Sequence, residues 1–378
     1  MKRTTPTPHS DRYVIIMAGG RGERFWPVSR EKTPKQLITL LGRKSFLQQA
    51  VANVTPLVPI ENVIVITNAV QAPEVARQLP KLPRENVVAE PVGRDTCAAV
   101  TLGAALVGAR SQGAVMAVLP ADHVIPDEAA FRQVLTDAFS VAEEGGIVTI
   151  GIKPTEPATG YGYIRVGEPL PTPPGIPARR TAFFRAEQFV EKPNHDKAVE
   201  YLASGRYRWN AGMFLWSFAT IAEGLRRHQP EMHAACERWI AAAASPARLR
   251  RVLAREYPGI QKISIDFALM ERADNVIVAD GAFDWDDLGS WTALARHLPA
   301  DAAGNCSSAD LLQVDASGNI VFDARTKGKR APIALVGVRN CILVQTDDAT
   351  LLASRDQAQR IKDLVKQLGA DPKRRKWV

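Results

Sequence analysis

Short apolar runs alternate with longer helical stretches between residues 13 and 150, and this alternation constrains the fold more than any other feature. The runs that predict strands are Val14–Met17, Val63–Thr67, Val87–Ala89, Val115–Leu119 and Ile147–Ile150. The stretches that predict helices between them are Ser45–Val54, Ala72–Leu79, Thr96–Ala109 and Glu128–Glu143. Such alternation is typical of βαβ units, whose helices cover both faces of a mainly parallel sheet. The sequence therefore predicts an α/β, doubly wound, Rossmann-like core.

The pattern changes after Gly151. Two longer and more polar strands are predicted at Gly160–Val166 and Phe183–Val190, with a Pro-rich loop at Pro171–Pro177 between them. We interpret this part as a lid or substrate subdomain inserted into the main sheet. Helical patterns then return at Asp196–Ala203, Phe218–Arg227, Glu231–Ala244 and Ser264–Glu271.

Beyond about residue 302 the segments become short and strand-like, and they indicate a small β-rich domain. Its predicted elements are the strands Leu311–Val314, Asn319–Phe322, Ile333–Val336 and Cys341–Gln345 and a closing helix at Arg355–Leu368. The predicted organisation is thus a disordered leader over residues 1–12, a main domain over 13–301 and the small domain over 302–378.

Composition excludes several classes of protein. No apolar run approaches the ~20 residues that span a bilayer, and the first one is too short for a signal peptide, so we expect a cytoplasmic protein that does not bind membranes. The four cysteines are far apart, which argues against a zinc site or disulfide framework. The net charge of +8 is spread along the chain. We expect it to attract phosphorylated substrates rather than nucleic acid.

Three glycines directly follow the first predicted strand, in the run Ala18-Gly19-Gly20-Arg21-Gly22. Glycines at the carboxyl end of a strand let backbone N–H groups approach and surround an anion, and a phosphate is the natural occupant. Arg24 and Lys35 follow as cations that could reach the same phosphates. A simple glycine turn with solvated charges is the alternative interpretation.

Two familiar glycine motifs do not fit this loop. A dinucleotide fingerprint needs a third glycine where Phe25 stands and an acidic residue at the end of the second strand, which instead ends in Thr67-Asn68. A P-loop needs Gly-Lys followed by Ser or Thr, and the loop has none.

Carboxylates recur at two places. Asp122 follows the predicted strand Val115–Leu119, at the edge of the sheet where the glycine loop also emerges. Mg²⁺ needs few carboxylates when phosphate oxygens and water complete its shell, so Asp122 is a candidate ligand, with helix capping as the alternative. Asp284, Asp286 and Asp287 cluster further along and would repel one another without a cation nearby. Surface acids at a helix start are the alternative there.

The segment Glu90-Pro91-Val92-Gly93-Arg94 lies between a predicted strand and a predicted helix. Guanine offers two donor groups and one acceptor on its edge, which a carboxylate together with an Arg or backbone donor could read. Glu90, Gly93 and Arg94 are therefore candidate base-binding residues.

These residues carry a resemblance to a known family. The run from Ala18 to Leu37 resembles the activation loop of the sugar-1-phosphate nucleotidylyltransferases, G-G-x-G-x-R-[LF]-x-P followed by P-K. The segment from Glu90 is similar to the E-P-x-G-R-N-T-A-P-A of the GDP-mannose branch, with Asp95, Cys97 and Ala98 as departures. Trp285–Trp291 resembles the family's W-x-D-x-G-[ST]-W.

The resemblance assigns roles to single residues. It implies that Arg24 and Lys35 contact the transferring and leaving phosphates and that Asp287, rather than Asp286, joins Asp122 on the metal. It implies that the backbone of the glycine loop binds the nucleotide. The implied nucleotide-binding residues are Ala18, Gly19, Gly20, Arg21, Gly22, Glu90, Gly93 and Arg94.

A sugar pocket is implied by three further matches, Thr159–Ile164, Val190–Pro193 and Trp209–Phe214. Glu191 and Asn210 can hydrogen-bond sugar hydroxyls, and Lys192 can neutralise a sugar phosphate. The implied sugar-phosphate residues are Tyr161, Gly162, Glu191, Lys192 and Asn210. The segment Ile263–Glu271 also matches the GDP-mannose branch, and we assign it to packing beneath the site.

For the whole chain, the resemblance implies a glycosyltransferase-A-like sheet and a left-handed β-helical C-terminal domain that supports a homodimer. The implied reaction is Mg²⁺-assisted transfer from GTP to mannose 1-phosphate, giving GDP-mannose and pyrophosphate. Two alternatives stay open: the same chemistry with glucose 1-phosphate and UTP or ATP, and a non-catalytic regulatory subunit that binds sugar nucleotides.

Overall fold

A computed structural model describes residues 11–171, 179–326, 328 and 330–378. The predicted leader before Asp11 and most of the Pro-rich loop after Pro171 lie outside these residues. The chain forms two compact units, which are each discontinuous in sequence. Unit 1 comprises Met1–Gly19, Ala50–Ala121 and Ile125–Trp285, and unit 2 comprises Gly20–Gln49, Asp122–Val124 and Asp286–Val378.

Unit 1 is built on a nine-stranded sheet of order β3-β2-β1-β4-β8-β5-β9-β7-β6. Its strands are β1 Arg12–Met17, β2 Val63–Asn68, β3 Val87–Glu90, β4 Val115–Pro120, β5 Ile147–Ile152, β6 Tyr163–Pro169, β7 Phe183–Val190, β8 Tyr207–Ser217 and β9 Val276–Gly281. The strands β1 to β4 pair in parallel, as do β5 and β9, whereas β8 is antiparallel to β4, β5 and β6. The α/β fold predicted from the alternating pattern is confirmed, with a mixed sheet where a mainly parallel one was predicted.

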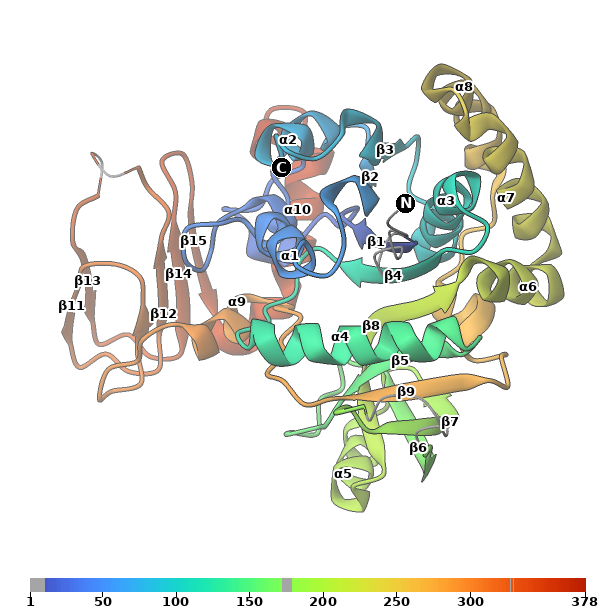
Figure 1. Ribbon diagram of the computed structural model, residues 1–378. Helices are drawn as coiled ribbons and strands as arrows, with labels where there is room; N and C mark the ends of the chain where they lie inside the picture. The colour runs from blue at the N-terminus through green and yellow to red at the C-terminus, as the bar shows by residue number, and fades with distance from the viewer. Residues whose placement is uncertain (1–10, 172–178, 327, 329) are drawn as a thin grey trace, which may run out of the picture. The chain divides into compact units, whose positions relative to one another are not determined.

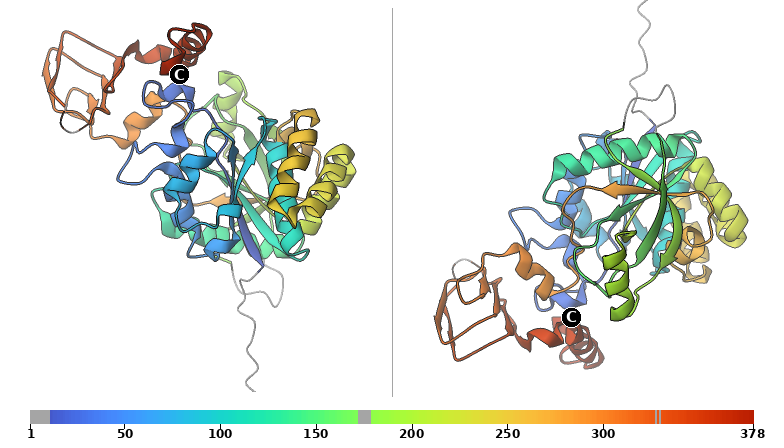
Figure 2. Two further views of the ribbon diagram at one scale, coloured as in Figure 1. Left: turned by 90° about the horizontal axis from the view of Figure 1, so that it is seen from above. Right: turned by 90° about the horizontal axis from the view of Figure 1, so that it is seen from below.

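Helices cover both faces of this sheet (Figures 1 and 2). One face carries α3, which contacts β1, β2 and β4, together with α6 and α7 packed on α3. The other carries α4, which contacts β4, β5, β8 and β9. The helices are α2 Ala72–Gln78, α3 Asp95–Arg110, α4 Glu128–Glu143, α5 His195–Ser204, α6 Phe218–His228, α7 Pro230–Ala243 and α8 Pro246–Glu256, and α1 Phe46–Val54 begins in unit 2 and ends in unit 1.

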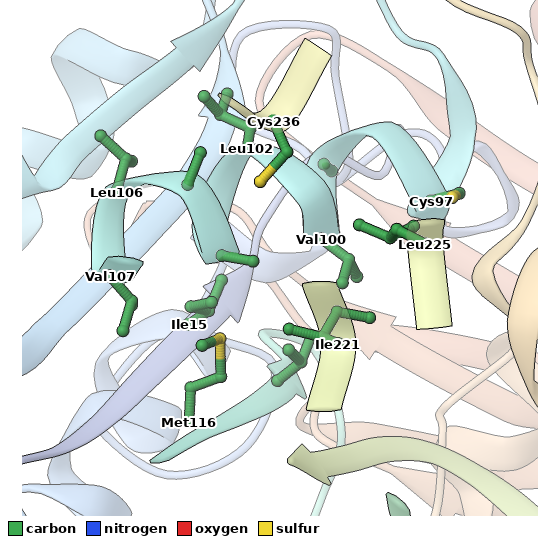
Figure 3. Close-up of a cluster of buried hydrophobic side chains, with 14 of the residues drawn as sticks. Ile15, Cys97, Val100, Leu102, Leu106, Val107, Met116, Ile221, Leu225 and Cys236 are labelled. Carbon is green, nitrogen blue, oxygen red and sulfur yellow. The ribbon is translucent and has the colours of Figure 1, made fainter. Parts of the chain in front are cut away.

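The core under α3 explains why this helix is apolar all round. Figure 3 shows Ile15 of β1 and Met116 of β4 among side chains of α3 and Ile221 of α6. Because α3 lies between the sheet and α7, every residue from Cys97 to Gly108 is buried. A helix that is apolar on all sides is expected only in such a buried layer.

Some elements of unit 1 are missing from the sequence-based prediction. The strands β8 and β9 and the helix α8 were not predicted, and the helix predicted at Ser264–Glu271 is a short π-helical turn at Asp266–Met270. In β8 the pairing register with β5 shifts around Gly212, which has φ +64°. Such a bulge interrupts the alternation by which a strand is recognised. At the other end, β1 begins at Arg12, where the predicted leader ends, because Arg12 pairs with Val115 through its backbone.

Unit 2 contains short strands stacked in register. The strands β10 Cys306–Ser307, β12 Ile320–Asp323 and β14 Cys341–Gln345 pair in parallel, β15 Thr350–Ser354 closes this sheet antiparallel, and β11 Leu311–Val314 pairs with β13 Ile333–Val336. Helices α9 Trp291–Leu294 and α10 Ile361–Ala370 complete the unit (Figure 1). Its core joins Phe25 and Trp26 of the glycine loop to Ile342 and Val365. The loop is thus part of the same hydrophobic core as the C-terminal strands.

No helix within the described residues combines the length and apolar character that crossing a membrane requires.

Candidate active site

The glycine loop folds tightly against the segment that carries Lys35. Gly22 has φ +61°, and a Cβ placed there would come within 2.5 Å of Lys35 Cβ and 2.8 Å of Lys35 N. Gln36 Nε2 donates to Gly20 O at 3.0 Å, and Ser29 Oγ donates to Arg21 O at 3.0 Å. Only glycine fits at position 22, because any side chain would force the two segments apart.

Lys35 connects the two segments that carry the candidate metal carboxylates. Its side chain is 6% exposed, and its Nζ donates to Asp122 Oδ2 at 2.8 Å. The same ammonium donates to the backbone carbonyl of Asp287. A buried ammonium needs such partners, since an unpaired charge away from water is strongly unfavourable. Lys35 therefore holds the Asp122 and Asp287 segments together.

The backbone reinforces this arrangement. Val124 N donates to Asp286 O at 2.8 Å, and Asp286 N donates to Val124 O at 3.1 Å. The Asp286 side chain is buried; it accepts from Leu288 N at 2.8 Å and contacts Arg296 and His297. Burial opposes ionisation of Asp286, but its hydrogen bonds with His297 and Leu288 and the nearby Arg296 lower its pKa below the ordinary value. Asp286 thus fixes the loop that presents Asp287.

Aromatic packing joins the glycine loop to the Asp287 loop. The rings of Phe25 and Trp291 lie 5.1 Å apart between centroids, and Trp291 Nε1 donates to Trp26 O at 3.2 Å. Trp291 is fully buried and also packs on Phe322 of β12. The aromatic positions of both motifs are therefore structural, and they set the spacing between Arg24 and Asp287.

These loops enclose a cavity of about 380 Å³ within unit 2, here called the phosphate cavity. It is lined by Arg21, Gly22, Glu23, Arg24, Phe25, Lys35, Asp122, His123, Asp287, Leu288, Gly289 and Lys362. All four predicted catalytic residues, Arg24, Lys35, Asp122 and Asp287, are among them.

The polar groups of the phosphate cavity are only partly satisfied. The Nε of Arg24 is buried and has no hydrogen-bond partner among the described residues. Buried donors in folded proteins almost always have an acceptor, so this N–H is suited to donate to an anionic ligand in the cavity. Burial raises the pKa of Asp122, but the neighbouring Lys35 outweighs it, and the net pKa lies below the usual range. Burial lowers the pKa of His123, which leaves that imidazole neutral at pH 7.

The donor set of the cavity fits a magnesium ion. Within the described residues no cluster of three or more His, Cys, Asp or Glu side chains could hold a metal by itself. Asp122 and Asp287 alone would satisfy Mg²⁺, because this ion takes one or two carboxylates and completes its shell with phosphate oxygens and water. The magnesium assignment is compatible with these residues and stays a prediction.

The predicted base-binding residues lie in unit 1. Glu90, the last residue of β3, is 7% exposed, and its Oε1 accepts from the Tyr257 hydroxyl at 2.5 Å. Its Oε2 faces Gly19, whose added Cβ would lie 3.4 Å away. Burial raises the pKa of Glu90 to about 7, although the Tyr257 hydrogen bond opposes the shift. One carboxylate oxygen is thus fixed, and the other lies beside Gly19.

Arg94 is half-buried, and the chain is buried from Cys97 to Gly108. Arg94 donates to the carbonyl of Pro258, which ties this loop to the end of α8. Asp95 adopts φ +66°, a conformation that Asp and Asn tolerate better than most residues. Cys97 and Ala98 are fully buried in the core. Two of the three departures from the family pattern, Cys97 and Ala98, therefore face the interior. Gly93, a candidate base-binding residue, is exposed in the loop.

The predicted sugar-binding residues form a second cluster in unit 1. Asn210 N donates to Gly162 O at 2.8 Å, and a Cβ on Gly162 would lie 2.8 Å from Glu191 Oε2. Lys192 donates to Glu191 and has φ +44°. Tyr161 packs edge-on against the nearby rings of Trp209 and Trp285, with centroids 5.0 and 5.1 Å away. The structure brings these residues together, as the resemblance implies.

Asn210 is oriented by a residue that sequence reasoning missed. Its Nδ2 donates to Asp266 Oδ1 at 2.7 Å, and its Oδ1 accepts from Gly212 N at 3.0 Å. The neighbours Ile265, Ala268 and Leu269 are buried in the core, so the segment does pack as predicted, but Asp266 does not serve packing. The one detectable signal was a single acid inside an apolar stretch. Tyr257 was missed too, because its role depends on Glu90, which is far away in the sequence. Asp286 was noticed in the acidic cluster, but its role in fixing the loop was not predicted.

One cavity is lined by a glycine loop, by several cations and by two carboxylates, and the chain also has a doubly wound α/β sheet. This is the arrangement of a nucleotidyltransferase. Comparisons with known proteins agree. A family model described as Nucleotidyl transferase matches residues 13–303, and one described as MannoseP isomerase/GMP-like beta-helix domain matches residues 310–368.

Individual relatives are similar over nearly the whole chain. Xanthan biosynthesis protein XanB from Xanthomonas campestris pv. campestris (strain B100) is 38% identical, over 95% of this chain and 73% of that protein. Mannose-1-phosphate guanylyltransferase from Escherichia coli (strain K12) is 37% identical, over 96% and 74%. The crystal structure of mannose-1-phosphate geranyltransferase from Thermus thermophilus superposes with a TM-score of 0.80 at 38% identity and covers 95% of this chain and 99% of that one. The chain therefore belongs to the nucleotidyl transferase family, and within it to the mannose-1-phosphate guanylyltransferases.

Proposed function

We propose that this enzyme transfers the guanylyl group of GTP to mannose 1-phosphate, giving GDP-mannose and pyrophosphate. The observation that carries the proposal is the phosphate cavity, which gathers Arg24, Lys35, Asp122 and Asp287 from three separate segments of the chain. The names of the similar proteins support mannose 1-phosphate as the acceptor.

The reaction is an in-line displacement at the α-phosphorus of GTP. An anionic oxygen of mannose 1-phosphate forms the new P–O bond, and the bond from the α-phosphorus to the oxygen that bridges to the β-phosphorus breaks. The bonding electrons leave with pyrophosphate. The nucleophile is already an anion, so no general base is required, and positioning and charge neutralisation carry the rate.

The residues of the phosphate cavity supply both the positioning and the charge neutralisation. Arg24, whose Nε has no acceptor among the described residues, contacts the departing pyrophosphate. Lys35 keeps the carboxylates in place through Asp122 and the Asp287 carbonyl and adds positive charge next to the phosphates. Asp122 and Asp287 would hold Mg²⁺, which when bound neutralises charge on the phosphates of both substrates.

Substrate selection rests on unit 1. Glu90 in its ionised form accepts from the N1–H and N2–H₂ groups of guanine. Asn210 and Glu191 hydrogen-bond the hydroxyls of mannose, and Lys192 pairs with the 1-phosphate. We further propose that the enzyme is a homodimer, which follows from the resemblance, and that it acts in the cytoplasm, which follows from the lack of a bilayer-length apolar run in the sequence.

A substrate panel tests the proposal. ATP, CTP, GTP and UTP are each combined with mannose 1-phosphate and with glucose 1-phosphate, and pyrophosphate release is measured with Mg²⁺ and with EDTA. The expected result is the fastest release with GTP and mannose 1-phosphate, abolished by EDTA and restored by excess Mg²⁺. Preference for glucose 1-phosphate with UTP or ATP would reassign the substrates, and no release with any pair would indicate a regulatory subunit.

A further inference from the structure

We propose that Lys362, in the first turn of the C-terminal helix α10, is a binding residue for the β- and γ-phosphates of GTP and hence for pyrophosphate. The inference rests on the proposed function and adds a residue that lies outside every motif of the activation and carboxylate loops. Lys362 lines the phosphate cavity together with Arg24, Lys35, Asp122 and Asp287.

The helix that carries Lys362 is fixed beside the glycine loop. Ile361 and Val365 are buried in the same hydrophobic core as Phe25 and Trp26. The helix also contacts the segment Glu23–Phe25 directly. Because its neighbour Ile361 is anchored in the core, Lys362 is held at the wall of the cavity rather than on a loose terminus.

The charge of Lys362 is available to a ligand. Across the part of the chain that the structure describes, Lys362 makes no hydrogen bond or ion pair. Lys35 differs, because its ammonium already serves Asp122 and the Asp287 carbonyl. Arg21 also lines the cavity, but it forms an ion pair with Glu23 at 3.7 Å. Arg24 and Lys362 are therefore the cavity cations that have no ion-pair partner among the described residues.

The chemistry of the reaction explains which phosphates these cations meet. The departing pyrophosphate carries several negative charges, and two carboxylates already add negative charge to the same cavity. A metal ion alone would leave this charge undercompensated, so further cations at the leaving group stabilise it. GDP-mannose and mannose 1-phosphate have no β- or γ-phosphate of GTP, so a residue at this place should not affect their binding.

The helix offers its own control residue. A second cavity, of about 670 Å³, adjoins the phosphate cavity and shares Arg21, Glu23 and Lys362 with it. Lys366 stands one turn further along α10, is also exposed and lines only this second cavity. Lys362→Gln and Lys366→Gln remove the same charge from the same helix, but only the first removes it from the phosphate cavity.

The test measures Michaelis constants in both directions with the full chain. For Lys362→Gln we expect KM for GTP, and KM for pyrophosphate in the reverse reaction, to rise about tenfold, as for loss of one charge-assisted hydrogen bond. KM for mannose 1-phosphate and for GDP-mannose should stay within about twofold of the wild-type values, because Lys362 would not contact either compound. Lys362→Arg should recover most of the pyrophosphate affinity, and Lys366→Gln should change no constant.

Three results would overturn the proposal. They are an unchanged KM for pyrophosphate in Lys362→Gln, an equal change in all four constants, or the same effect in Lys366→Gln. Direct calorimetry of pyrophosphate binding to the wild type and Lys362→Gln keeps the test separate from the proposed function. If the wild type makes no GDP-mannose but binds pyrophosphate more tightly than the variant, the assignment of Lys362 holds and only the substrates change. Equal binding by the two proteins refutes it.

Discussion

The phosphate cavity of unit 2 and the recognition residues of unit 1 satisfy their polar groups in different ways. In the cavity, Arg24 Nε has no acceptor among the described residues, and Lys362 makes no ion pair there. In unit 1, Glu90 is already bonded to Tyr257 and Asn210 to Asp266. The cavity thus keeps charge for its ligand, whereas Glu90 and Asn210 are pre-oriented by protein partners, which lowers the cost of ordering them on binding.

The comparison predicts the largest effect on turnover at Asp287. Asp287→Asn should lower kcat by about two to three orders of magnitude, because a charged group that acts on the reacting phosphates is lost. The melting temperature should change little. Steady-state kinetics with Mg²⁺ and a thermal melt check both outcomes. Near-normal turnover would remove Asp287 from the metal site.

The neighbouring Asp286 is the matched control. It is 4% exposed and bonded to Leu288, Arg296 and His297, so Asp286→Asn should lower the melting temperature by about 3 °C or more. Its pKa is depressed in the folded state, so its contribution to stability is present at neutral pH and is lost as acid protonates it. If Asp286→Asn melted like the wild type and lost as much turnover as Asp287→Asn, the assignment of the two roles would be reversed.

In unit 1, a smaller effect is expected at Asp266. Asp266→Asn should raise KM for mannose 1-phosphate about tenfold, because an amide can donate as well as accept and no longer dictates which way the Asn210 amide points. KM for GTP should be unchanged. Glu271→Gln, an exposed acid on the same segment, is the control and should affect neither constant. An equal rise of both KM values in Asp266→Asn would indicate a general disturbance of the fold.

The pKa of Glu90 predicts a pH dependence of nucleotide affinity. Since that pKa lies at about 7, the carboxylate is mainly protonated at pH 6 and mainly ionised at pH 8. The ionised form accepts the donors of guanine, so KM for GTP should fall several-fold between these pH values. In Glu90→Gln this dependence should disappear and KM should stay high. A KM that falls equally in wild type and variant would assign the titration to another group, such as the phosphates of GTP.

The raised pKa of Glu90 also affects the stability of the fold: a higher pH favours GTP binding but disfavours folding. A folded-state pKa raised from 4.5 to about 7 means that folding disfavours the ionised form, so stability falls as pH rises through this interval. The Glu90→Gln variant escapes this cost. Urea denaturation should show it more stable than wild type by roughly 1–3 kcal/mol at pH 8, and by less at pH 6. A larger advantage at pH 6 would contradict this account.

The smallest effect is expected at Cys97. This residue is fully buried, and burial raises the pKa of its thiol to about 12, so it stays protonated and inert. Cys97→Ala should cost about 1 kcal/mol of unfolding free energy and leave the preference for GTP over UTP unchanged within error. A changed base preference in the substrate panel would show that the buried departures from the family pattern do reach the base.

Local features of the sequence were enough for much of the fold. The buried strands Val63–Asn68 and Val115–Pro120 read as continuous apolar runs, and the helix Glu128–Glu143 has its capping Asp127 and an amphipathic period. Both signals act within one element, so they can be read without knowing its partners. Strand β8 was missed because its bulge near Gly212 is stabilised by the strands on either side.

The candidate site residues also divide into those that the sequence indicates and those whose roles depend on tertiary contacts. The sequence by itself indicated the glycine loop, Arg24, Lys35 and Asp122 as candidates, because the glycines and Asp122 directly follow predicted strands, and the family resemblance selected Asp287 over Asp286. Only the tertiary structure decided that Tyr257 fixes Glu90, that Asp266 orients Asn210, that Asp286 shapes the loop of Asp287, and that Lys362 lines the phosphate cavity. Each of these contacts joins a polar group to a partner that packing places beside it, and no periodicity in the chain encodes which partner that is.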